Sequence, residues 1–123
     1  MVAAFSWVTL HDRVGFYLAV AAVLGALIGL VALVTPFVGT VLKLYVRLLL
    51  LAVAIQIVLG GVLYVTGHRP SSEVHYLFGA GVAVTLGITI AVSRRTPWPL
   101  SKLPVIVGAV IAAAFAVLAL TSG

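Results

Sequence analysis

The sequence predicts an all-α fold, a polytopic membrane four-helix bundle with a two-helix internal repeat. The 123 residues are 64% hydrophobic and 7% charged, with a mean hydropathy of +1.36, far above the range of soluble domains. Four uncharged stretches, 14–34, 48–67, 76–93 and 103–123, each approach or exceed the roughly 20 residues that cross about 30 Å of hydrocarbon. The first and third of these stretches also open on similar segments, which indicates the repeat.

The first two helices are expected over about 10–35 and 41–66. Thr9 followed by Asp12 matches a capping pattern that places the first helix start near residue 10. Pro36 disfavours helix in the residue before it, and Gly67 ends the second helix. The N-terminus has neither a basic region nor a small-residue cleavage site after its apolar run, so we expect the first helix to be retained.

The last two helices are expected over about 73–92 and 103–121, which gives a single transmembrane domain over residues 1–123. Ser72 is the expected N-cap of the third helix, and Glu73 suits its first turn. The fourth helix has no polar side chain before Thr121. We therefore expect it to pack against its neighbours or face lipid, and to carry no chemistry.

The basic residues are distributed as in a membrane protein. Arg13 and Arg69 belong to the N-terminal segment and the second connection, and the other five flank the first and third connections: Lys43, Arg47, Arg94, Arg95 and Lys102. By the positive-inside rule this asymmetry places the first and third connections in the cytoplasm and both termini outside. We expect a multi-pass protein of a prokaryotic-type cell membrane. The net charge of +5 is then explained by the orientation of the chain in the membrane, and no nucleic-acid partner is expected.

Two histidines begin the matching segments of the repeat. His11 and His75 are each followed by a glycine four residues later, Gly15 and Gly79, and by an alanine after four more. A spacing of four keeps these residues on one helix face, so each histidine lies beside a groove lined by small side chains. A parallel repeat relates the first and third helices by a pseudo-twofold axis along the membrane normal. The sequence thus places the two imidazoles at one depth, facing each other.

A pair of facing imidazoles is the ligand set that a b-type haem requires, and helix bundles hold such groups between facing helices. We predict His11 and His75 as the metal ligands. The glycines would leave volume for the porphyrin, Gln56 would face the same cavity, and two arginines would pair with propionates. The remaining predicted cofactor-binding residues are Gly15, Gly79, Gly60, Gly61, Arg13 and Arg69. With no cysteine in the chain, thiolate ligation and thioether attachment are excluded.

A structural explanation stays open beside the haem prediction. Histidines near headgroups are ordinary interfacial residues, and glycines are common where membrane helices pack closely. His68, between Gly67 and Pro70, is expected to be solvated or near a propionate because a loop positions a metal ligand less well than a helix.

The segments QIVLGGVLYVTG (56–67) and VHYLFGAG (74–81) resemble the haem A synthase family. That family repeats a four-helix half with a histidine-arginine helix, a Q-x-x-L-G-G helix and a V-H helix in this order. The resemblance implies that His11 and His75 are axial ligands of a haem b near the outer face. The acidic residue that the family carries about one turn before its first histidine would fall near Val8, and the chain has the length of one half only.

The function we expect is electron transfer by a small membrane cytochrome or cytochrome subunit. A half-size haem A synthase-like enzyme, acting on haem as a homodimer, is the enzymatic alternative, although no acidic residue occupies the position of Val8. A third hypothesis is a cofactor-free accessory subunit of a larger respiratory or photosynthetic membrane complex. A transporter is disfavoured because no helix has an acidic or broken centre.

Overall fold

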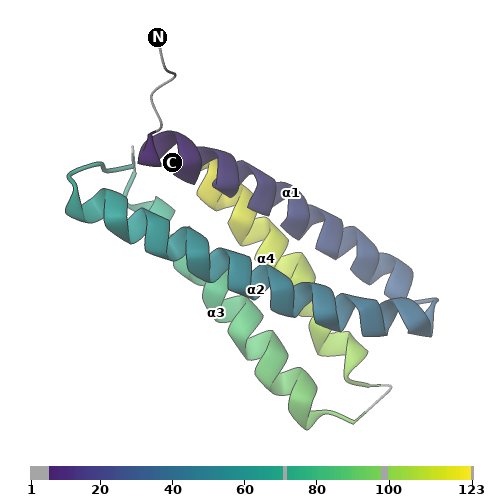
Figure 1. Ribbon diagram of the computed structural model, residues 1–123. Coiled ribbons are helices and arrows are strands. Elements are labelled where there is room, and N and C mark those ends of the chain that lie inside the picture. The colour runs from purple at the N-terminus through teal and green to yellow at the C-terminus, as the bar shows by residue number, and fades with distance from the viewer. Residues whose placement is uncertain (1–5, 71, 98–99, 123) are drawn as a thin grey trace.

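The computed structural model describes residues 6–70, 72–97 and 100–122, and every regular element in these ranges is a helix. The helices are α1 (Trp7–Ala32), α2 (Pro36–Val65), α3 (Val74–Arg95) and α4 (Lys102–Ser122). They run alternately up and down as an elongated bundle, with the start of α1 and the end of α4 at the same end (Figure 1). The predicted all-α four-helix bundle is confirmed.

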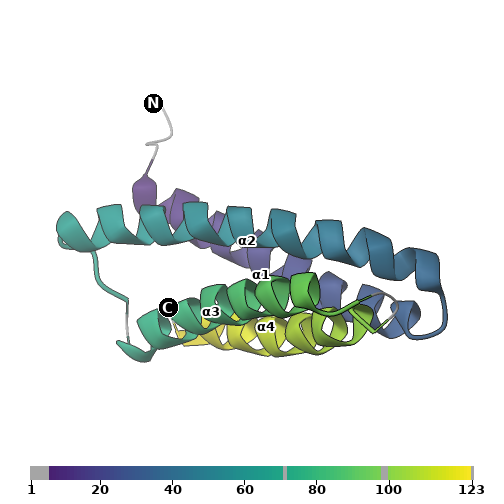
Figure 2. The ribbon, with the colours of Figure 1, turned by 90° about the horizontal axis from the view of Figure 1, so that it is seen from below.

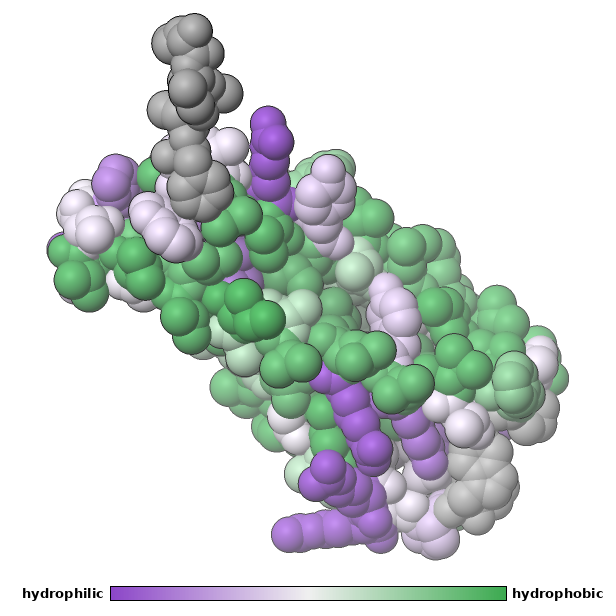
Figure 3. All heavy atoms as spheres, in the orientation of Figure 1, coloured by the Kyte–Doolittle hydropathy of each residue, from purple (hydrophilic) through white to green (hydrophobic). Residues whose placement is uncertain are grey.

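Each of the four helices is long and apolar enough to cross a membrane. In Figure 3 hydrophilic side chains gather toward the two ends of the visible face, and the length between them is largely apolar. Large side chains such as Leu27, Leu51 and Ile88 are more than half exposed along the helices. Such a surface suits hydrocarbon rather than water.

Two predicted helix starts differ from the structure. The N-cap of α1 is Ser6, whose hydroxyl accepts a hydrogen bond from the Thr9 backbone N–H at 3.4 Å, so the helix begins at Trp7 and not near residue 10. The first position of α2 is Pro36, five residues before the predicted start. Proline is favoured at that position because it has no N–H to leave unpaired and its φ is already helical.

In the bundle α1 packs on α2 and α4, α3 packs on α4 and α2, and α2 and α4 also contact each other across the bundle. Figure 2 shows α3 and α4 side by side beneath α2. Small residues allow the closest approach: a Cβ on Gly108 of α4 would lie 1.8 Å from Thr89 Oγ1 of α3. On the other side of the bundle, Gly25 of α1 lies against the Tyr45 ring of α2. The helices α1 and α3 are diagonal neighbours without packing contact over the described residues.

The well-packed core lies in the half of the bundle away from the chain ends. Among its largest fully buried side chains are Leu42, Val46, Leu86 and Val105. In the same half, Lys43 Nζ of α2 donates a hydrogen bond to Ser101 Oγ, just before α4, at 2.5 Å. This half holds the four helices together, and a cavity lies in the opposite half.

Candidate functional site

A cavity of about 810 Å³ lies between the helices in the half where α1 begins and α4 ends. All four helices and the α2–α3 connection contribute to its wall. The part toward the middle of the bundle is apolar and is lined by Leu18, Ala22, Leu49, Val53, Val82 and Ala116. The mouth, at the end of the bundle, is polar and aromatic and is lined by Tyr64, His68, Arg69, Pro70 and Tyr76. A ligand with an apolar body and a polar edge would match this gradient.

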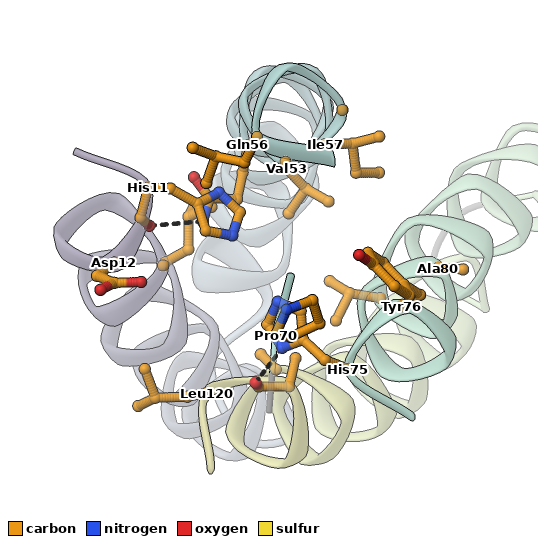
Figure 4. Close-up of a pocket in the computed structure, with 18 of the residues that line it drawn as sticks. His11, Asp12, Val53, Gln56, Ile57, Pro70, His75, Tyr76, Ala80 and Leu120 are labelled. Atoms are coloured by element: carbon orange, nitrogen blue, oxygen red, sulfur yellow. Dashed lines mark hydrogen bonds between the residues drawn. The ribbon is translucent and has the colours of Figure 1, made fainter. Parts of the chain in front are cut away.

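His11 of α1 and His75 of α3 project into this cavity from diagonally opposite helices (Figure 4). Their ring centroids are 6.0 Å apart and their planes are inclined by 73°. Each ring is only partly buried, because the helices that carry the two side chains do not pack together. The predicted convergence of the two imidazoles is therefore present in the structure.

His75 is held in one orientation by the end of α4. Its Nδ1 lies 2.7 Å from the carbonyl oxygen of Ala119, and because a carbonyl only accepts, Nδ1–H is the donor. The Ala119 carbonyl belongs to the last turn of α4, where backbone acceptors lack helical partners. The same oxygen also accepts from Ser122 Oγ at 3.1 Å. Protonation at Nδ1 leaves Nε2 of a neutral His75 as a free acceptor or metal ligand.

His11 is held by a reciprocal fit between α1 and α2. Its ring lies over Gly60 of α2, where an added Cβ would be 3.3 Å from His11 Cε1. In return, the Gln56 side chain lies over Gly15 of α1, where a Cβ would be 3.0 Å from Gln56 Nε2. Gln56 Nε2 also donates a 2.7 Å hydrogen bond to the His11 backbone carbonyl. Each glycine therefore makes room for the polar side chain of the opposite helix.

Two polar atoms in this contact have no hydrogen-bond partner among the described residues. They are His11 Nδ1 and Gln56 Oε1, and both are buried. Leaving such an atom unpaired costs about 1–3 kcal/mol, so native proteins rarely tolerate it without a functional reason. His11 differs in this respect from His75, whose Nδ1 is paired.

The mouth of the cavity carries one cation and two tyrosines. The Arg69 guanidinium lies 3.7 Å from the centroid of the Tyr64 ring, and the Tyr64 and Tyr76 rings meet edge to face at 6.0 Å. Stacking on Tyr64 holds the charge of Arg69 at the opening. His68 is exposed, and its Nδ1 lies 3.1 Å from Thr66 Oγ1.

Most of the predicted site residues line this cavity, and two do not. His11, His75, Gly15, Gln56, Gly60, Gly61 and Arg69 belong to its wall. Gly79 and Arg13 do not: α3 lines the cavity with His75, Tyr76, Ala80 and Val82, and Gly79 lies outside the wall. Sequence reasoning missed Tyr76, which follows His75 directly, and the Ala119 carbonyl, for which a backbone atom gives no sequence signal.

The donor set and the space fit a haem. A metal–imidazole bond of about 2 Å plus about 1 Å from nitrogen to ring centre separates two trans imidazole centres by about 6 Å, which matches the observed 6.0 Å. The cavity of about 810 Å³ lies within the usual range for cofactor sites. Among the described residues, no group of three or more histidine or acidic side chains offers an alternative metal centre.

The chain matches no protein-family model, no curated protein and no solved structure.

Proposed function

We propose that this chain is an integral membrane protein that binds one b-type haem through His11 and His75 and serves in electron transfer. The observation that supports this most is the 6.0 Å separation of two imidazoles projecting from helices that do not otherwise pack together. His11 and His75 would hold the haem, and when bound it would supply reversible one-electron transfer.

The residues of the chain would divide the work of binding. The Ala119 carbonyl fixes the tautomer of His75 so that Nε2 faces the cavity. The apolar wall around Leu49 and Val53 excludes water from the ligand body, and this exclusion strengthens the electrostatic contacts inside the cavity. Arg69, held at the mouth by Tyr64, is placed to pair with carboxylates at the ligand edge.

The proposed setting is a prokaryotic-type cell membrane with the cavity mouth on the outer side. The basic residues beside the α1–α2 and α3–α4 connections support this orientation. The start of α1 and the end of α4 lie at the opposite end of the bundle (Figure 1), where residues of the α2–α3 connection line the cavity mouth. The electron partner would then approach from outside, from within the lipid, or from a larger complex of which this chain is a subunit.

Single histidine variants test the ligand assignment. His11→Ala and His75→Ala should each abolish the sharp b-type bands of a reduced-minus-oxidised spectrum of the purified protein. The matched control is His68→Ala, because this ring is exposed and lies beside Thr66, and its spectrum should match the wild type. Retention of low-spin haem by both His11→Ala and His75→Ala contradicts the assignment, and a folded, colourless wild-type protein favours the accessory-subunit hypothesis instead.

A further inference from the structure

The contact between α1 and α2 contains more polar groups than helix packing requires. Gln56 is partly buried at the cavity wall, and one end of its amide is fixed because Nε2 donates to the His11 carbonyl at 2.7 Å. Gly15 leaves the space that this amide occupies. An apolar side chain would fill the same space without the cost of desolvating an amide.

The other end of the amide is one of two unpaired polar atoms in this contact. Gln56 Oε1 is an acceptor without a donor, and His11 Nδ1 is a ring nitrogen without a partner. Gln56 and Gly60 lie one helical turn apart, and the His11 ring rests on Gly60 with Cε1 at 3.3 Å from the ideal Cβ position. The ring and the amide are therefore neighbours, as Figure 4 shows.

We infer that Gln56 is the positioning residue of His11, with Oε1 accepting a hydrogen bond from His11 Nδ1–H when the ring turns to ligate a metal. This inference rests on the proposed haem function. It gives His11 the arrangement that His75 already has, in which Nδ1–H donates to an oxygen and Nε2 is left for the metal. A hydrogen bond between these two atoms would satisfy both of them.

The chemical consequence is a change in ligand basicity. An acceptor on Nδ1–H increases electron density at Nε2 and so favours the ferric state, which lowers the reduction potential. Gln56 would thus tune the potential without touching the metal. It would also prevent His11 from taking the tautomer whose Nε2 carries the proton.

Two substitutions separate this role from packing. Gln56→Met removes both ends of the amide at similar length, whereas Gln56→Glu keeps an oxygen acceptor at the same length but exchanges the Nε2 donor for a second, ionisable carboxyl oxygen. The control is Val58→Met, since Val58 is 65% exposed on the lipid-facing side of α2. The reduction potential of each purified protein is measured by spectroelectrochemical titration, together with the ferric electron paramagnetic resonance spectrum.

We expect Gln56→Met to keep a b-type spectrum and to have a reduction potential higher by about 59 mV. This shift corresponds to a tenfold loss in the preference for the ferric state. Gln56→Glu should have the wild-type potential or a lower one, and Val58→Met should have the wild-type potential. A haem-loaded Gln56→Met at the wild-type potential overturns the inference, and so does an upward shift in Gln56→Glu. Where Gln56→Met fails to fold, the direction of the Gln56→Glu shift decides. A wild-type protein that binds no haem refutes the proposed function itself.

Discussion

Replacing Gly60 with alanine tests how strongly haem binding depends on the position of the His11 ring. An ideal Cβ at this position lies 3.3 Å from Cε1 of His11, 3.9 Å from Nδ1 and 4.0 Å from Nε2. Only the Cε1 distance falls below ordinary van der Waals contact, so the ring must tilt by a few tenths of an ångström. Metal–ligand distances tolerate about 0.2 Å. The displacement of the ring is therefore larger than the change in metal–ligand distance that such a site tolerates.

We expect Gly60→Ala to weaken haem binding about tenfold, the lower end of the effect of disturbing a metal ligand through its surroundings. This corresponds to about 1.4 kcal/mol. The assay is titration of the haem-free protein in detergent, followed by absorbance. The control is Gly87→Ala on α3, where a Cβ meets nothing within 4 Å and the gain in helix propensity is the same, about 1 kcal/mol. Equal haem affinities of Gly60→Ala and Gly87→Ala would show that haem binding does not depend on the contact between Gly60 and the His11 ring.

Three further predictions concern packing, the cavity mouth and orientation. Gly108→Ala places a Cβ 1.8 Å from Oγ1 of the buried Thr89 and should destabilise the protein by about 1–3 kcal/mol or more; thermal unfolding in detergent checks this, and a melting temperature equal to that of Gly87→Ala would contradict it. Arg69→Ala should weaken haem binding several-fold, whereas Arg13→Ala should not, because of these two residues only Arg69 lines the cavity. Haem titration compares the two affinities, and weaker binding by Arg13→Ala than by Arg69→Ala would show that Arg13 contacts the ligand. An alkaline phosphatase reporter, which is active only outside the cytoplasm, should be active when fused after the last residue, as the basic residues predict, and an inactive fusion would contradict this orientation.

The existence of the helices is predictable because bilayer thickness sets the length of an apolar run. The first residue of each helix is less predictable, because two capping signals compete within a few residues. Ser6 caps α1 although Thr9 and Asp12 form the better sequence pattern. Pro36 indicates the end of the preceding helix. Proline is also favoured as the first residue of a helix, and here it begins α2.

The candidate site is predictable to the level of helix faces. A spacing of four placed His11 with Gly15 and Gln56 with Gly60 on common faces, and the structure brings these faces together. Which glycine receives which side chain depends on helix rotation and register, which no spacing determines. The same freedom explains Gly79: it shares the histidine motif, but α3 turns Tyr76 and Ala80 toward the cavity.

The most direct test of the haem proposal is the ferric electron paramagnetic resonance spectrum of the purified wild-type protein, recorded with a pyridine haemochrome assay on the same sample. We expect one haem b per chain and a low-spin signal typical of two imidazole ligands. A high-spin signal, or a folded protein without haem after expression with ample haem supply, would contradict it.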